Sequence, residues 1–265
     1  MSLIDRFPND FLWGTATSAY QIEGAADQAG RGRSIWDVFC DGPGNVANGD
    51  SGLEACDHYH RFEEDVQLMA NMGVGAYRFS ISWPRLLPHG SRDQVNQVGI
   101  DFYNALIDCC IAHGIQPWVT LYHWDLPDDL QVSSNGWMSE ATSDLFADYA
   151  QLCFEQFGDR VKRWITINEA WVVSVLGHGQ GVFAPGHCSN SEPYQVAHNL
   201  LLAHGKAVKI YRDQFQSAQG GMIGITNNCD WREPLTDSPQ NRAAAQRALE
   251  FFLGWFADPI YHGDY

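Results

Sequence analysis

The chain has 265 residues, of which 45% are hydrophobic and 18% are charged, and this balance indicates a folded globular protein rather than a disordered one. Its 32 acidic residues outnumber its 16 basic residues, so the formal net charge is -16. This charge argues against binding to nucleic acids or to anionic membrane surfaces, because both require basic patches.

Four further features concern the compartment. The seven cysteines form no CxxC motif, no apolar run is long enough to span a membrane, and no Asn-x-Ser/Thr acceptor occurs. The stretch Met1–Pro8 has no basic segment followed by an apolar one. We therefore expect a cytoplasmic protein with free thiols and no membrane segment.

Short apolar runs alternate with longer amphipathic segments along the whole chain. The first strand is expected at 11–16 and continues into 18–24, and a long loop rich in Gly, Asp and Asn follows at 30–56. The other strands are expected at 76–83, 116–122, 163–169 and 222–226. The helices are expected at 60–72, 100–113, 139–157 (capped by Ser139), 193–215 and 238–256 (opened by Ser238 and Pro239).

This alternation of strand and helix predicts a parallel α/β architecture. Because neither a repeat nor a linker is visible, residues 1–265 are expected to form a single domain. Closed barrels of this kind have eight strands, whereas five strand–helix units fill this chain. An open sheet of five strands is expected to leave an unpaired edge and uncovered apolar residues such as Leu249, Phe252 and Trp255.

The run from Arg163 to Glu169 is the most informative of the strands. Its apolar residues fit a buried parallel strand, and Asn168 and Glu169 stand at the carboxyl end, where such barrels place their chemistry. An amide beside a carboxylate suits a sugar-hydroxyl contact next to a proton donor. Alternatively, Asn168 caps a helix whose first turn holds Glu169.

Other strand ends carry polar side chains as well. Taken alone, His123 is more often a structural histidine, and Arg78 more often pairs with a buried acid. Convergence from four strands favours a shared site for a polyhydroxylated substrate, with hydrogen-bonding groups, one cation, one aromatic face and one carboxylate. The set is Gln21, Arg78, His123, Trp124, Asn168 and Glu169.

Five stretches carry a resemblance to a known family. They are Phe11–Gly24, Tyr77–Arg85, Thr120–Pro127, Thr166–Glu169 and Gly181–Gly186. In this order they resemble the β-glucosidases of family 1 of the glycoside hydrolases. The resemblance implies a (β/α)8 TIM barrel, of which this chain holds the first five units as its N-terminal part, and a retaining mechanism with two carboxylates.

The resemblance also implies roles for individual residues. Glu169 matches the general acid/base, and Arg78 matches the arginine that pairs with the nucleophile. Trp171 matches an aromatic residue that lines the side of the leaving group, the aglycone. The remaining matches are sugar contacts: Gln21, His123 and Asn168 for hydroxyls, and Trp124 for the wall of the innermost subsite.

Two features depart from the family pattern. Ala170 follows the acid/base where the family usually has proline, so residue 169 is not restricted to extended geometry. The Thr-Glu-Asn-Gly stretch that holds the family's nucleophile does not occur. Glu23, Asp57 and Asp125 are better explained as partners of loops and neighbouring side chains.

Three functional expectations follow from the missing stretch. The first is a β-glucosidase for β-glucosides or small oligosaccharides, with the nucleophile supplied by a complementing C-terminal chain. The second is a non-catalytic sugar-binding protein, and the third is an inactive truncated fragment. In each case we expect the open barrel edge to be covered, either by the complementing C-terminal chain or by self-association of identical chains. No cofactor or metal is expected, since His58 and His60 have no third ligand at useful spacing.

Overall fold

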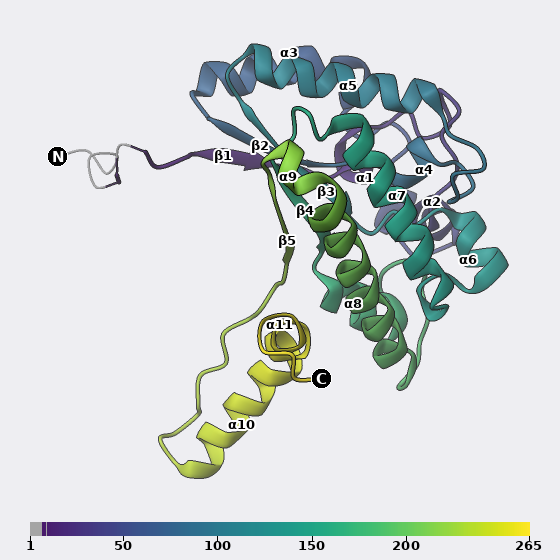
Figure 1. Cartoon of the computed structure of the whole chain (residues 1–265). Coiled ribbons are helices and arrows are strands. Elements are labelled where there is room, and N and C mark those ends of the chain that lie inside the picture. The colour runs from purple at the N-terminus through teal and green to yellow at the C-terminus, as the bar shows by residue number, and fades with distance from the viewer. Residues whose placement is uncertain (1–6, 9) are drawn as a thin grey trace.

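The computed structural model describes residues 7–8 and 10–265, which form one parallel sheet with helices packed along it (Figure 1). The strand order in the sheet is β1-β2-β3-β4-β5, and every neighbouring pair is parallel. This sequential order is that of a barrel, and the expected α/β architecture is confirmed. The strands are β1 (Gly14–Ala16), β2 (Ala76–Ser80), β3 (Gln116–Tyr122), β4 (Arg163–Asn168) and β5 (Met222–Thr226).

Long helices follow the strands and cover the outer side of the sheet (Figure 1). They are α3 (His58–Met72), α5 (Gln97–Ala112), α7 (Ala141–Phe157) and α8 (Glu192–Ile210). The last helical segment, α10 (Pro239–Leu249) with α11 (Trp255–Tyr261), is joined to β5 by a long connection. Shorter helical elements are α1 (Ala19–Ile22), α2 (Ile35–Asp41), η2 (Ala47–Gly49), α4 (Trp83–Leu86), α6 (Asp128–Ser134), η3 (Gly136–Met138), η4 (Val172–Gly177), η5 (Tyr211–Phe215), α9 (Gln216–Gln219) and η6 (Glu250–Gly254).

The structure corrects the expected strand and loop near the N-terminus. Residues 18–24 are not a strand, because the helical turn α1 begins immediately after β1. Residues 30–56 are not a plain loop, because they contain α2. A capping box starts α2: the hydroxyl of Ser34 accepts from the backbone N–H of Asp37, and the Asp37 carboxylate accepts from the N–H of Ser34.

Other boundaries also differ from expectation. Strand β2 ends at Ser80, and Trp83 begins α4. Pro84 lies in the first turn of α4, where the missing N–H of a proline costs no helical hydrogen bond. The N-cap of α7 is Glu140 rather than Ser139. Ser238 does cap α10, but the helical path runs on through Pro259 inside α11 instead of ending before it.

An aromatic cluster fixes the carboxyl ends of β2 and β3. The rings of Trp83 and Tyr149 are stacked with their centroids 4.9 Å apart. The buried hydroxyl of Tyr149 lies 3.1 Å from the carbonyl oxygen of Ile81 and 2.9 Å from that of Leu121, so α7 is tied to both strands. This packing sets the position of the loops that follow the two strands.

The outer strands β1 and β5 each pair on one side only within the described residues. Near β5 several apolar side chains are exposed, with Phe251 at 62% and Met222 at 56%, whereas Leu249, Phe252 and Trp255 are half-buried. A cavity of about 840 Å³ lies between α8, β5 and α11. Among the described residues, none of the helices combines the length and the hydropathy needed to cross a bilayer.

Candidate active site at the carboxyl ends of the strands

Three of the predicted site residues form a chain of hydrogen bonds across neighbouring strands. Arg78 in β2 donates through Nη2 to Oδ1 of Asn168 at 2.5 Å and through Nε to Oγ1 of Thr120 at 3.0 Å. Nδ2 of Asn168, at the end of β4, lies 3.2 Å from Nε2 of His123, which follows β3. The alternative in which Asn168 caps a helix is therefore wrong, because it is a strand residue whose side chain bonds two other strand ends.

Burial determines the charge of His123. Desolvation, together with the nearby Arg78 guanidinium, lowers the pKa of His123 to about 3. The imidazole is therefore neutral near neutral pH, so it can accept as well as donate a hydrogen bond. Desolvation also lowers the pKa of Arg78, although the negative charge of Glu169 opposes this shift. A neutral imidazole beside a cation suits an uncharged, hydroxyl-rich ligand.

Trp124 is held by its own hydrogen bond. Its indole Nε1 donates to the carbonyl oxygen of Asn168 at 2.8 Å, and its backbone φ of 75° lies in the left-handed region. Such a conformation is unfavourable for a bulky side chain, so the surrounding contacts must impose it. The ring also packs against Phe183, with the centroids 5.7 Å apart.

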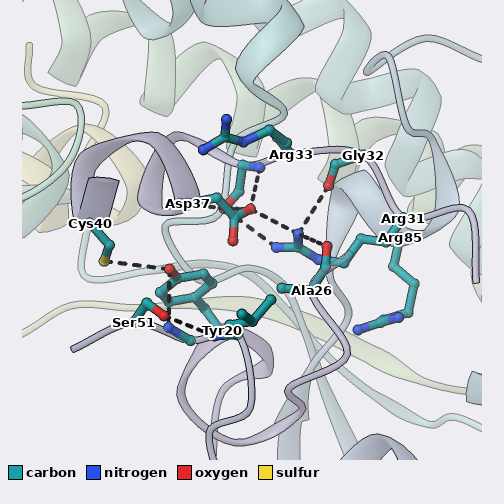
Figure 2. A network of polar contacts seen from close by, with 12 residues as sticks. Tyr20, Ala26, Arg31, Gly32, Arg33, Asp37, Cys40, Ser51 and Arg85 are labelled. Atoms are coloured by element: carbon teal, nitrogen blue, oxygen red, sulfur yellow. Dashed lines mark hydrogen bonds and ion pairs between the residues drawn. The ribbon is translucent and has the colours of Figure 1, made fainter. Parts of the chain in front are cut away.

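A cavity of about 370 Å³ brings Gln21, His123 and Trp124 together. Much of its remaining wall comes from the segment 18–55, including Tyr20, Trp36 and Cys40. Figure 2 shows how this segment is held: Arg31 lies between Asp37 and the carbonyl groups of Ala26 and Gly32, and the Tyr20 hydroxyl lies beside Cys40. The wall therefore has polar groups for hydroxyls and aromatic faces for a ring.

Glu169 stands between β4 and η4. Its backbone N–H donates to the carbonyl oxygen of Thr226 in β5 at 2.8 Å, and its φ of 52° is left-handed. Its side chain is half-buried, and this desolvation raises the pKa of the carboxyl group, although the nearby Arg78 guanidinium partly offsets the shift. A raised pKa favours the protonated acid, which can donate a proton.

Trp171 lies apart from the cavity that holds Gln21 and His123. Its ring stacks on Phe252 with the centroids 4.1 Å apart and the planes 14° from parallel. It lines a second cavity of about 440 Å³, together with Tyr194 and Trp255. Of the segment that follows Glu169, Trp171 lines the second cavity, whereas Phe183 lines the cavity that holds Gln21 and His123.

Comparison with known proteins identifies the family. The family model for glycosyl hydrolase family 1 matches residues 3–265. The chain belongs to this family. It is 53% identical to β-glucosidase 1B of Phanerodontia chrysosporium over 98% of this chain and 51% of that protein. It is 51% identical to β-glucosidase 4 of rice over 98% of this chain and 54% of that protein.

Solved structures of the family show the same fold. A rice β-glucosidase superimposes with a TM-score of 0.96 at 50% identity, over 98% of this chain and 56% of that one. A family 1 β-glucosidase from Thermotoga maritima gives a TM-score of 0.93 at 49% identity, over 98% and 57%. The chain thus has the fold of the first five units of the family's TIM barrel and spans about half the length of the curated relatives it matches.

Two residues of the candidate site are not indicated by the sequence. Thr120 bonds Arg78 from inside β3, and Trp36, in the supposed loop, contacts Phe183 with the ring centroids 5.5 Å apart. The alternation along a strand predicts which face of the sheet Thr120 and Arg78 occupy. It does not predict which residues of neighbouring strands lie side by side. The capping box at Ser34 was the one local signal that could have revealed the helix carrying Trp36.

The expectation that this cavity binds a sugar can be tested by mutation. Replacing Gln21 or His123 with alanine is expected to weaken binding of glucose by about 1–3 kcal/mol, because a sugar hydroxyl in the cavity loses its partner. The loss should shrink for the deoxy sugar that lacks that hydroxyl. Calorimetric titration with glucose and its deoxy analogues checks this, with the exposed Gln67→Ala on α3 as a control. An equal loss for every sugar contradicts the assignment.

Proposed function

We propose that this chain is the acid/base part of a retaining β-glucosidase. The observation that carries the proposal is the half-buried carboxyl group of Glu169, whose pKa is raised by desolvation, at the same strand ends as the linked residues Arg78, His123 and Asn168. A general acid needs a proton near neutral pH, and a sugar subsite needs such hydrogen-bonding groups.

In the proposed reaction Glu169 gives its proton to the glycosidic oxygen. The bond from that oxygen to the anomeric carbon breaks, and a carboxylate nucleophile forms a new bond to the same carbon. Glu169 then takes a proton from a water molecule, whose oxygen displaces the enzyme carboxylate and releases the sugar. A rice relative solved in a covalent complex with glucose supports the covalent step.

The nucleophile is proposed to come from outside the described residues. Retaining enzymes hold their two carboxyl groups about 5–5.5 Å apart, and Arg78 is the only charged group in the described part of the chain that shifts the pKa of Glu169. The last three strand–helix units of a family 1 barrel would pair with the free edges of β1 and β5. Arg78 would then face the incoming carboxylate.

The substrate class proposed is a β-glucoside or a small oligosaccharide. The aromatic faces of Trp124, Trp36 and Phe183 suit the apolar face of a pyranose ring, and Gln21 and His123 suit its hydroxyls. Trp171 would contact the leaving group. The free cysteines support a reducing compartment, the cytoplasm, as the proposed location.

A non-catalytic sugar-binding protein is the second candidate. The specific observation in its favour is that the cavity is lined within this chain, whereas no described acid acts on Glu169. Sugar binding without turnover by this chain, unchanged by any added segment, would support this candidate over the enzyme.

The test is hydrolysis of an aryl β-glucoside by this chain, by a separate chain with the last three units of a family 1 barrel, and by their mixture. We expect no turnover by either part and measurable turnover by the mixture. The Glu169→Gln variant in the mixture is the control. Robust turnover by this chain alone, abolished by Glu169→Gln, would contradict the need for a second part, and an inactive mixture that forms a stable complex would contradict the enzyme assignment.

A further inference from the structure

One buried acid next to the sugar cavity has no place in the proposed reaction. Asp125 follows the cavity residues His123 and Trp124 directly and is fully buried. Neither of its carboxyl oxygens accepts a hydrogen bond from a protein group in the described part of the chain. An ionised carboxylate in such a place is expensive, whereas a neutral carboxylic acid is tolerated.

The charges around Asp125 balance without it. Arg31 pairs with Asp37 at 2.8 Å, and Arg85 pairs with Glu23 at 2.9 Å, with both arginine side chains at most 3% exposed. Each buried cation therefore already has its own acid. An ionised Asp125 would add a third negative charge to two cations, so the geometry favours its protonated form.

The groups that face Asp125 come from several elements. They are Ser82 before α4, Arg31 before α2, Glu23 after α1, Tyr122 in β3 and Tyr149 in α7. Desolvation raises the pKa of Asp125 to about 8, and the Ser82 hydroxyl and the Arg31 charge oppose this only in part. Ser82 is close enough to lower the pKa but makes no hydrogen bond of standard geometry with it.

Asp125 is also linked to two parts of the cavity wall. On one side, the next residue, Leu126, accepts from the N–H of Ile35 at 2.9 Å, which joins this turn to α2. On the other side, Glu23 follows Gln21 by two positions and is bonded to Arg85 and Tyr103. A charge appearing on Asp125 would disturb the strained Trp124 turn and the anchor of Gln21 together.

We propose that Asp125 is a positioning residue, which keeps His123, Trp124 and Gln21 in their sugar-binding arrangement only while its carboxyl group is protonated. The effect on sugar rests on the proposed function, whereas the protonation of Asp125 does not. His123 is already neutral above about pH 4, because its pKa is about 3, so it does not produce a change at alkaline pH.

The sign of the pH effect follows from linkage. A pKa of about 8 in the folded chain exceeds the ordinary value of about 3.9 for an unfolded aspartate. The folded state therefore holds an extra proton between these values, and its stability falls as the pH rises through this window. In Asp125→Asn the amide cannot ionise, so this contribution to the pH dependence disappears.

The first experiment measures urea unfolding of the chain from about pH 5 to about pH 9, because the linkage applies in this window. The variants are Asp125→Asn and the matched control Asp101→Asn, an exposed acid on α5. The unfolding constant of the unmodified chain should rise relative to that of Asp125→Asn by up to about tenfold per pH unit and level off above about pH 8. Asp101→Asn should follow the unmodified chain. Parallel curves for the unmodified chain and Asp125→Asn would overturn the proposal.

The second experiment measures glucose binding by calorimetry at two pH values. One value lies at least about one unit below the pKa of Asp125, and the other lies at least about one unit above it. The dissociation constant of the unmodified chain should rise about threefold to tenfold at the higher pH, the size expected for one disturbed hydrogen bond. Asp125→Asn should bind equally at both. An equal rise in both proteins overturns the positioning role, even if the protonation is as proposed.

Two outcomes separate this proposal from the proposed function. If glucose binds at neither pH, the sugar site fails, and the unfolding curves alone decide the protonation of Asp125. If Asp125→Asn does not fold, the carboxyl carbon of Asp125 is followed by NMR in the unmodified chain. A midpoint near the ordinary value of about 3.9 would then overturn the proposal.

Discussion

Replacing Glu169 with glutamine is expected to slow hydrolysis of glucosides with poor leaving groups by about 10²–10⁴-fold in the assembled barrel. The amide cannot give a proton to the glycosidic oxygen, so an alkyl alkoxide would have to leave unprotonated. Activated aryl glucosides should lose less in the first step, because their phenolates leave without a proton. Steady-state and burst kinetics on an alkyl and an aryl substrate measure the two effects.

The geometry gives the Glu169 experiment a clear control. Glu63 is an exposed glutamate on α3, and Glu63→Gln should leave both rates unchanged. Added azide, a small nucleophile, should rescue the second step of Glu169→Gln, because it needs no general base. Equal losses on both substrates in the first step would show that Glu169 is not the proton donor.

The second large effect concerns the buried pair of Arg85 and Glu23. Arg85→Met is expected to lower the free energy of unfolding by about 3–5 kcal/mol, because it leaves a buried carboxylate without its cation. The Arg85 side chain is 0% exposed, donates to Glu23 at 2.9 Å and lies 4.5 Å from the ring centroid of Tyr59. Urea unfolding at neutral pH measures the loss.

A double-mutant cycle separates the charge from the packing. The double variant Glu23→Gln/Arg85→Met leaves no uncompensated charge buried. Its loss in the free energy of unfolding should therefore be smaller than that of Arg85→Met alone. Arg61 pairs with Glu64 on the exposed face of α3, and Arg61→Met should leave stability nearly unchanged, because water screens an exposed ion pair. Additive losses in the cycle would mean that the buried pair is not coupled.

Local patterns were sufficient for two of the strands and for several helix ends. The bounds expected for β3 and β5 agree with the structure, because each is a short apolar run with a glycine close before it. Helix α3 ends at Gly73, whose φ of 76° is the left-handed conformation that glycine permits at a helix end. By contrast, α2 was missed because its turn residues outweighed a short capping signal.

The candidate site, like the fold, was predicted from the sequence only in part. Parallel strands bring their carboxyl ends to one edge, so the sequence alone was enough to expect Arg78, His123 and Asn168 near one another, and the structure links them by hydrogen bonds. The position of Glu169 beside them follows for the same reason. The resemblance placed Trp171 toward the leaving group, and the structure places it against Phe252, outside the cavity of Gln21 and His123.

By itself, the sequence determined the family, the parallel order of strand and helix, and which side chains stand at the strand ends, because these depend on local periodicity and on motifs. Only the tertiary structure decided the partners of those side chains. The bond from Arg78 to Asn168, the burial that makes His123 neutral and the isolation of Asp125 all depend on residues distant in the chain. Desolvation and hydrogen bonding act through space, so no local pattern contains them.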